Sequence, residues 1–374
     1  MLQRTTLIRT AVGLSLAALL AFAVFAAPEP SMTADFQAGK AQLGSAGPLA
    51  FGPDGVLFVG DSVGSAILAL DTNDLTAPKS AVKIDVEGID AKIAALVGVT
   101  PDQIMINDLK VSPVSKNIYL SASRGKGPDA LPLIVRVNAA GNVSLLSLDN
   151  IKHASVSLTD APDANPSAKQ DPRMMTITDM NYLNGNLMVA GLSNEEWSSA
   201  LRSIPFPFKA ASKRTTLQIW HSSHGKYETQ SPVRTFVPYT IAGQQYILAA
   251  YTCTPLVKIA MSDLKAGAQV KGVTIADLGS GNQPLDMVPY KKDGHEYILV
   301  ANTSLGMVKL KADSLETYKA IDSPTVVNVA GVPYDKLAEL KNVKQLAQMG
   351  ASDAVILMGQ AGAGAMNLQT IALP

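Results

Sequence analysis

The sequence predicts an all-β protein, a six-bladed β-propeller built from four-stranded blades. One pattern recurs six times: an apolar run that ends in small residues, a loop, and a second apolar run. The copies align on these residues: Gly60, Ser121, Ala190, Ala250, Ala301 and Met358. Repeats of this kind, each holding several short strands, are typical of propeller blades. The composition agrees, because 47% of the residues are hydrophobic and only 17% are charged, as expected for sheets buried on both faces.

Residues 1–26 are predicted to be a signal peptide. Arg4 and Arg9 precede an uncharged, apolar stretch, and small residues stand around a cleavage site near Ala26. An uncleaved anchor is the alternative. We therefore expect a periplasmic or secreted protein, free of the membrane after cleavage, with a single propeller domain over residues 34–374. Removing two arginines from the 31 basic residues leaves 29 against 31 acidic ones, so no nucleic-acid surface is expected.

Strands can be assigned in each blade and are called A to D from the axis outward. Blade 1 is predicted at 48–51, 56–60, 66–70 and 81–86, and blade 2 at 108–111, 117–121, 132–137 and 143–148. Blades 3 to 6 begin at Asp179, near Thr235, at Asp286 and near Leu346. The last blade ends without a strand D. Residues 34–43 are therefore expected to supply that strand and so to close the ring.

Insertions should gather on one face of the ring. Helices are expected at 90–97 and 335–346, residues 194–214 are expected to split strands B and C of blade 3, and residues 151–173 are expected to be a mobile loop. In a propeller the B–C and D–A connections emerge on the same face. We call this the elaborated face, and the face with the A–B turns the plain face. The elaborated face is predicted to bind the ligand.

Asp108, Asp179 and Asp286 each begin an innermost strand. Equivalent positions converge on the axis of a closed ring, where three carboxylates repel one another unless a cation or shared protons neutralise them. They are therefore candidate ligands for Ca²⁺ or a similar divalent cation, to which Asn107, Asn181 and Asn302 could add neutral oxygens. The alternative is that each aspartate caps the start of its strand. No CxxCH haem motif and no glycine-rich phosphate loop occurs, so neither haem nor a nucleotide is expected.

Trp197, Phe206 and Phe208 lie in the predicted blade 3 insertion, where they could anchor a ligand or pack the insertion onto the blades. His221 and His224 are predicted in a solvated C–D hairpin turn on the plain face, with Glu228 nearby, which makes them a weak metal signal. Cys253, the single cysteine, is expected on the elaborated face as a small apolar residue and not as a nucleophile.

The blade pattern, with acidic residues at the starts of innermost strands, resembles the six-bladed propellers of the gluconolactonase, paraoxonase and NHL-repeat kind. The resemblance covers the whole mature chain at the level of the fold. For lactonase-type enzymes it implies an axial divalent cation held by Glu, Asn and Asp, and Asp108, Asp179 and Asp286 match that placement. Blade 1 has Pro48 and Leu49 where such enzymes have a glutamate. NHL-type relatives are binding scaffolds.

Two functions follow from the sequence. The first is an exported binding module that recognises a small ligand or a protein partner on the elaborated face. The second is a metal-dependent hydrolase that acts on an ester or a lactone with a divalent cation on the axis. Binding is favoured, because the sequence offers no clear general base.

Overall fold

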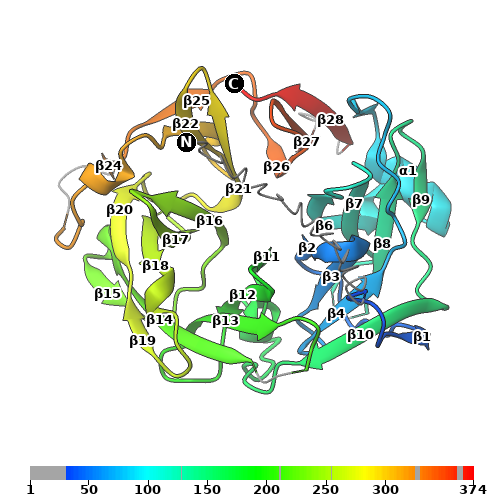
Figure 1. Ribbon diagram of the computed structural model, residues 1–374, viewed down its shortest axis with the longest axis horizontal. Helices are drawn as coiled ribbons and strands as arrows, with labels where there is room; N and C mark the ends of the chain where they lie inside the picture. Colours follow the sequence, from blue (N-terminus) through cyan, green and yellow to red (C-terminus); the bar gives the residue numbers. More distant parts are fainter. Residues whose placement is uncertain (1–30, 128, 210–211, 254, 325–328, 360–364) are drawn as a thin grey trace, which may run out of the picture. The chain divides into compact units, whose positions relative to one another are not determined.

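The computed structural model is a six-bladed β-propeller, as the sequence predicts (Figure 1). It describes residues 31–127, 129–209, 212–253, 255–324, 329–359 and 365–374, so the predicted signal peptide lies outside the described residues. Met32–Pro374 form one compact unit. Within the described ranges no helix is long and apolar enough to cross a membrane.

Each blade is a twisted sheet whose neighbouring strands are antiparallel, except that β19 runs parallel to β14. The innermost strands of blades 1 to 6 are β2 (Leu49–Phe51), β6 (Ile104–Val111), β11 (Asp179–Leu183), β16 (Thr235–Ile241), β21 (Pro284–Lys292) and β26 (Val343–Gln348).

The other strands follow outward from the axis in each blade. Blade 1 adds β3 (Val56–Asp61), β4 (Ala66–Asp71), β10 (Ile151–Ser157) and β1 (Gln37–Gly39), and blade 2 adds β7 (Ile118–Arg124), β8 (Leu131–Val137) and β9 (Val143–Leu145). Blade 3 adds β12 (Asn186–Leu192), β13 (Ser199–Pro205), β14 (Lys213–His221), β15 (Lys226–Glu228) and β19 (Gln269–Lys271). Blade 4 adds β17 (Gln244–Ala250), β18 (Pro255–Ala260), β20 (Val273–Asp277) and β24 (Ala330–Gly331). Blade 5 adds β22 (His295–Asn302), β23 (Gly306–Lys311) and β25 (Tyr334–Leu337), and blade 6 adds β27 (Asp353–Gly359), β28 (Met366–Ala372) and β5 (Asp85–Val86).

Helical segments are short. The α-helix α1 (Ile89–Val97) confirms the helix predicted at 90–97, and it is flanked by left-handed Gly88 and Gly98. The 3-10 turns are η1 (Pro53–Gly55), η2 (Pro101–Gln103), η3 (Pro172–Met175), η4 (Ser222–His224), η5 (Met261–Asp263) and η6 (Leu315–Thr317).

Blades 1 and 2 are exchanged in the ring relative to their order in the chain. The innermost strand β2 contacts β11 and β6, and β26 contacts β21 and β6. Around the axis the blades therefore run 1, 3, 4, 5, 6, 2, which can be followed in Figure 1. After β4 the chain adds β5 to blade 6, builds blade 2, returns to add β10 to blade 1, and only then enters blade 3.

This path corrects the predicted closure of the ring. Residues 34–43 do not complete the last blade, because β1 pairs with β10 at the outer edge of blade 1. The strand that completes blade 6 is β5, which was expected in blade 1. The segment 151–173, expected as a mobile loop, begins with β10, the true strand D of blade 1. An outer strand pairs with whichever edge lies beside it, and sequential strands are neighbours only about two-thirds of the time.

Two further expectations are wrong, the first because a turn was missed and the second because a strand was missed. The segment 335–346 is not a helix: it contains the end of β25 and the start of β26, and Asn342, with a φ of 61°, turns the chain between them. The insertion at 194–214 contains the strand β13. The strand that follows it, β14, is therefore strand D of blade 3 and not strand C, and it runs back toward the elaborated face.

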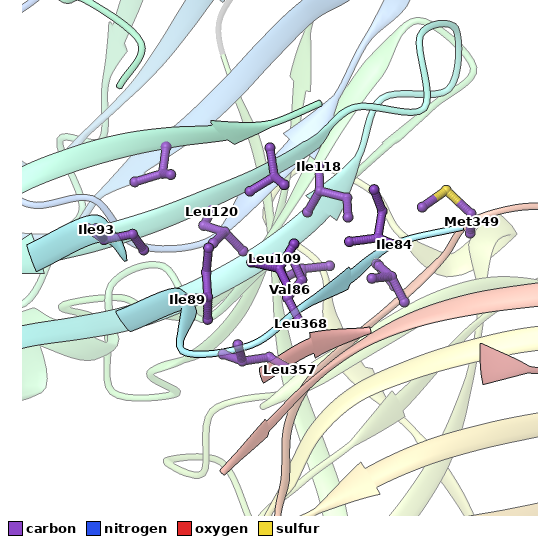
Figure 2. Packing of buried hydrophobic residues seen from close by; sticks show 14 of the residues in the cluster. Ile84, Val86, Ile89, Ile93, Leu109, Ile118, Leu120, Met349, Leu357 and Leu368 are labelled. Atoms are coloured by element: carbon purple, nitrogen blue, oxygen red, sulfur yellow. The ribbon is translucent and has the colours of Figure 1, made fainter. Parts of the chain in front are cut away.

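The closing strand is held by the apolar core between blades 2 and 6 (Figure 2). Val86 packs there with Ile89 of α1, Leu109 of β6, and Leu357 and Leu368 of blade 6, and all five side chains are at most 4% exposed. Burying a side chain of this size contributes about 1.5–3 kcal/mol. The seam between the two blades is thus closed by a segment that lies between blades 1 and 2 in the chain.

Paired cysteines test both the closure and the blade order in a Cys253→Ser background. Asp85→Cys with Gln369→Cys should form a disulfide, because these residues are register partners. Ala38→Cys with Lys152→Cys should do the same. Ala38→Cys with Gln369→Cys should remain reduced, which mass spectrometry after mild oxidation would measure. Cross-linking of that last pair would show that the ring closes through the N-terminal segment.

Candidate ligand site on the propeller axis

The three predicted aspartates occupy alternate positions in a ring of six around the axis. Each blade contributes one residue near the start of its innermost strand, and this residue pairs with the equivalent position of strand B in every blade. Taken around the axis, these residues are Pro48, Asp179, Thr235, Asp286, Gln345 and Asp108. Carboxylates thus alternate with neutral side chains, which is the widest separation that three negative charges can have in this ring.

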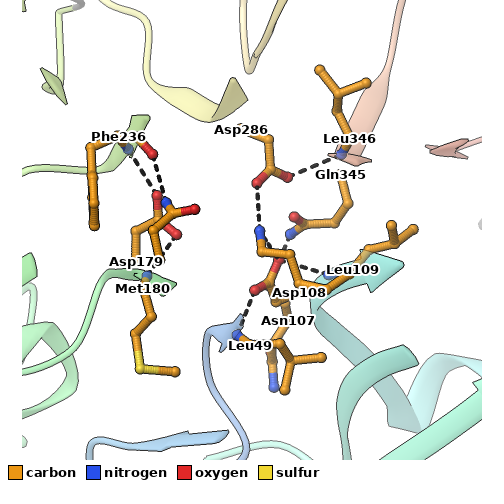
Figure 3. Close-up of polar contacts among 12 residues, drawn as sticks. Leu49, Asn107, Asp108, Leu109, Asp179, Met180, Phe236, Asp286, Gln345 and Leu346 are labelled. Carbon is orange, nitrogen blue, oxygen red and sulfur yellow. Dashed lines mark hydrogen bonds and ion pairs between the residues drawn. The ribbon is translucent and has the colours of Figure 1, made fainter. Parts of the chain in front are cut away.

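Each aspartate also joins its blade to the next one around the ring (Figure 3). The Oδ2 atoms of Asp108, Asp179 and Asp286 accept backbone N–H bonds from Leu49, Phe236 and Leu346 at 2.7, 2.8 and 3.0 Å. In every case the donor follows the neutral ring residue of the neighbouring blade. The other oxygen of Asp108 and of Asp179 accepts from the next backbone N–H of its own strand. These carboxylates are therefore held rigidly.

A lysine lies among the carboxylates. Lys110 is two residues after Asp108 in β6, so both side chains face the axis. Its Nζ lies 3.4 Å from Asp108 Oδ1 and 3.3 Å from Asp286 Oδ1. Tight N⁺–H···O⁻ bonds measure about 2.7–2.9 Å, so the ammonium is shared between the two carboxylates. The predicted divalent cation would have to displace this group. The axial metal site stays a prediction, and Lys110 supplies a positive charge without it.

Burial governs the protonation of the ring. Burial raises the pKa of Asp286 to about 8; the Lys110 ammonium opposes this rise, and Asp108 and Asp179 add to it. Burial likewise raises the pKa of Asp179 to about 6. Burial alone would lower the pKa of Lys110, but the three carboxylates outweigh it and the pKa rises. At neutral pH the ring thus holds one ammonium, two carboxylates and one protonated carboxyl group, a net charge of −1.

The aspartates separate two cavities on the axis. A cavity of about 170 Å³ at the elaborated face is lined by all three aspartates and by Asn107, Thr178, Arg234, Gln283, Gln345 and the segment 284–285, with Pro48. A second cavity, of about 280 Å³, extends toward the plain face and is lined by Lys110, Asn181 and the following parts of the innermost strands. Asp179 and Asp286 line both. We call the first the axial cavity.

Arg234 adds a positive charge to the wall of the axial cavity. With the Gln283 amide turned to face it, the Gln283 oxygen accepts from Arg234 Nε at 3.3 Å and from Nη2 at 2.6 Å. Burial lowers the pKa of Arg234, but a guanidinium remains charged at neutral pH. The axial cavity, together with the Lys110 ammonium that contacts two of its aspartates from the second cavity, is therefore close to neutral and rich in both donors and acceptors.

The three predicted asparagines are dispersed. Asn107 lines the axial cavity, where its Nδ2 donates to Ala46 O at 2.8 Å. Asn181 lines the second cavity and donates to Phe236 O at 2.9 Å. Asn302 is the last residue of β22 in blade 5, where its side chain bonds Asn282 and is not part of the axial lining. Two of the three amides thus flank the aspartates, one on each side.

The aromatic residues are not gathered on the elaborated face. The N–H of Phe206 donates to the carbonyl oxygen of Gly185 in an A–B turn, which places it on the plain face. Its ring is 5% exposed and packs edge-on against Phe58 at 4.9 Å, and Phe208 packs against Phe206 at 5.2 Å. Both extend the core because they follow β13, the strand hidden in the insertion. Trp197 is half-buried in the B–C loop on the elaborated face.

The histidine turn also lies elsewhere than predicted. Because β14 is strand D, His221 and His224 reach the elaborated face and not the plain one, and His221 is only 2% exposed. Glu228 accepts bonds from both rings at 2.7 and 2.6 Å. Burial alone would raise the pKa of Glu228, but hydrogen bonds from His221, Ser231 and His224 outweigh it and lower that pKa to about 2. The turn is thus an ordered polar cluster and not a solvated hairpin.

Sequence reasoning missed Lys110, Arg234 and Gln345. Lys110 could have been found, because alternation along a strand places residue 110 on the same side as Asp108. The repeat also indicates Gln345, if the predicted start of blade 6 is shifted from Leu346 to the preceding residue to allow for the bulge in β26. Arg234 lies in the connection before β16, outside any repeated strand, so no pattern marks it.

No protein-family model and no curated protein matches this chain. Among solved structures it is similar to a glucose dehydrogenase-type oxidoreductase of Thermus thermophilus, at 12% identity over 90% of this chain and 100% of that one, with a TM-score of 0.36. It is also similar to a PQQ-bound aldose sugar dehydrogenase of Streptomyces coelicolor (11% identity, 90% and 96% coverage, TM-score 0.35). The apo aldose sugar dehydrogenase of Escherichia coli gives 12% identity, 91% and 99% coverage and a TM-score of 0.32. Likenesses this distant carry no argument about activity.

Removing the shared ammonium should destabilise the propeller. Lys110→Met leaves Asp108 and Asp286 facing each other without a cation, and breaking a buried pair in this way costs about 3–5 kcal/mol. Urea unfolding at pH 7 would measure the loss. The exposed Lys311→Met is the matched control and should change little. Millimolar Ca²⁺ should restore part of the loss in Lys110→Met alone. Equal stability of the two variants would contradict a central role for Lys110.

The raised pKa of Asp286 makes stability fall as the pH rises. The folded protein holds this proton up to about pH 8, whereas the unfolded chain releases it near the ordinary aspartate pKa of 3.8. The stabilisation is therefore complete below about pH 4 and is lost progressively up to about pH 8, by at most about 1.4 kcal/mol per pH unit. Asp286→Asn should flatten this dependence in urea titrations at pH 5, 6.5 and 8. An unchanged slope would show that another group is responsible.

Proposed function

We propose that this protein binds a small, neutral polyhydroxyl ligand in the axial cavity on its elaborated face. The main support is the position of Asp108, Asp179 and Asp286, which alternate with neutral residues around a cavity of about 170 Å³. Arg234 and two glutamine side chains also line this cavity. Hydroxyl groups both donate and accept hydrogen bonds. Carboxylates can accept from such a ligand, while the guanidinium and the amides can donate to it.

Charge balance supports a neutral ligand over an ion. The ammonium and the guanidinium offset the two ionised carboxylates, so the cavity has little net attraction for an anion or a cation. Rigidity supports binding itself. The backbone N–H bonds that fix each carboxylate to the next blade leave it little freedom to lose when a ligand binds, and such preorganisation raises affinity.

Binding in this cavity should depend on the aspartates that line it. Titration of the purified protein with a panel of monosaccharides and polyols, followed by calorimetry or NMR, should reveal a saturable ligand. Asp179→Asn should weaken that ligand at least about tenfold, because each charged hydrogen bond contributes roughly 1.5–3 kcal/mol. Asp353→Asn removes the carboxylate at the start of β27 that pairs with Lys83 and does not line the axial cavity; this variant is the matched control and should bind normally.

Two outcomes would contradict the proposal. The first is equal affinity of the wild type and Asp179→Asn. The second is loss of binding only on Tyr246→Ala, because Tyr246 lines a larger cavity of about 400 Å³ at the plain face together with Tyr239 and Tyr290. That result would move the ligand to the opposite side of the ring.

A metal-dependent hydrolase acting on an ester or a lactone is the second candidate, and it rests on the same three carboxylates. It requires a divalent cation to displace the ammonium from between Asp108 and Asp286. Calcium titration of the wild type distinguishes the two functions. Tight, stoichiometric Ca²⁺ binding that Asp286→Asn abolishes would favour the hydrolase, and binding that appears only in Lys110→Met would favour the ligand-binding module.

A further inference from the structure

A second cluster of side chains lies on the elaborated face, outside the axial cavity. His221 ends β14, His224 ends the turn η4, and Cys253 lies in the loop between β17 and β18. One possible ligand atom of each of the three residues lies within 4.8 Å of those of the other two. The two histidines come from blade 3 and the cysteine from blade 4, so the contact between these blades brings them together, and no sequence spacing reveals the group.

Glu228 orients both imidazoles. Its Oε2 is 2.7 Å from His221 Nδ1 and its Oε1 is 2.6 Å from His224 Nδ1, while Ser231 Oγ donates to Oε2 at 2.6 Å. An ionised carboxylate can only accept hydrogen bonds, so both Nδ1 atoms carry protons. The lone pair of a neutral ring in this tautomer lies on Nε2, the atom that a metal ion would bind. A carboxylate behind a histidine in this way is the usual support of a metal ligand.

The Nε2 atom of His221 is an independent indication. It is buried and has no hydrogen-bond partner among the residues that the structure describes, although its ring is fixed by Glu228. Leaving a buried polar atom unpaired costs about 1–3 kcal/mol. A metal ion bound to this nitrogen would remove the deficit, whereas a purely structural histidine would be expected to find a second partner.

The position of Cys253 is also specified. Its backbone has a φ of 60°, which a residue other than glycine rarely adopts, and its N–H donates to Asn282 O at 2.7 Å. This bond ties the loop of blade 4 to the connection that leads into blade 5. The cysteine is therefore held beside the histidines in spite of an unfavourable backbone conformation.

We propose that His221, His224 and Cys253 form a site for a divalent transition metal, with Zn²⁺ as the best match. Imidazole nitrogen and thiolate sulfur are the ligands that zinc prefers. Zn–N bonds of about 2.0–2.1 Å and Zn–S bonds of about 2.3 Å place tetrahedral ligands roughly 3.3–3.8 Å apart, so binding requires the cluster to contract by about 1 Å. A thiolate and Glu228 together balance the charge of the ion.

The site leaves one coordination position open. Three protein ligands bind the ion, and the His224 side chain is 49% exposed, so solvent or a small ligand can reach the fourth position. Zinc sites that act on substrates have this arrangement, whereas structural zinc sites have four protein ligands. The residues between Ser231 and Arg234 connect Glu228 to the wall of the axial cavity, so the two sites share one face and one short segment.

Metal titration of the full-length protein tests the proposal. After chelator treatment and dialysis, Zn²⁺ should bind with one-to-one stoichiometry against a chromophoric competitor and should raise the melting temperature. Co²⁺ should give the absorption bands of tetrahedral coordination together with a thiolate charge-transfer band. Cys253→Ser should remove that band and should weaken Zn²⁺ binding by on the order of 100-fold or more, since even supporting residues contribute 10- to 100-fold.

Matched variants keep the test decisive. His295 is bonded to the Asp313 carboxylate at 2.9 Å as His221 is to Glu228, but it does not belong to the cluster, so His295→Gln should bind Zn²⁺ normally. Glu228→Gln should weaken binding by roughly 10- to 100-fold. Cys253→Ser is used besides His221→Gln because Cys253 is half-buried and its replacement should leave the fold intact by circular dichroism. Two results would overturn the proposal. The first is a Cys253→Ser variant that binds Zn²⁺ as tightly as the wild type. The second is a wild type that binds Zn²⁺ no more tightly than the double variant Cys253→Ser/His221→Gln.

Discussion

The ion pair of the half-buried Lys110 ammonium with Asp108 and Asp286 is the interaction on which the centre of this propeller depends. Blades converge on the axis, so whatever charge their first residues carry is brought together away from water. Three aspartates in alternate blades use that convergence to join neighbouring blades through backbone N–H bonds. Their mutual repulsion is contained by one lysine and by one proton on Asp286. Stability and chemistry at the axis therefore depend on the three aspartates and Lys110 together and not on any single residue.

The same carboxylates join the blades and line the proposed ligand site. This double role explains why the lining of the small axial cavity is rigid. A carboxylate that already accepts two backbone N–H bonds keeps lone pairs that a ligand can use. Its position is set by two blades at once, so a ligand meets acceptors that need no rearrangement. The proposed metal site formed by His221, His224 and Cys253 is built differently. Its ligands come from the end of β14, the turn η4 and a B–C loop, where hydrogen bonds to Glu228 orient the histidines and one backbone bond holds Cys253.

The sequence predicts the number of blades, most innermost strands and the convergence of Asp108, Asp179 and Asp286 near one cavity. These follow from local alternation and from the repeat, which are properties of single blades. The exchanged blades could not be predicted, because the outer strands β5 and β10 would fit the edge of either neighbouring blade. The placement of His221 failed for a related reason. Missing the one strand β13 reversed the direction of β14 and moved the turn to the other face. Cys253 was placed on the correct face, but its histidine partners were not.

The exchanged order of blades 1 and 2 affects how the chain can fold while it is being made. Blade 2 emerges from the ribosome early. The face of blade 2 that carries α1 packs against blade 6, however, and blade 6 includes the last strand of the chain. The strand β5 has no sheet to join until β28 has been synthesised. The apolar surface that carries Val86, Ile89 and Leu109 therefore stays uncovered through nearly the whole of synthesis, and the nascent chain needs protection there that a propeller built strictly in order would not.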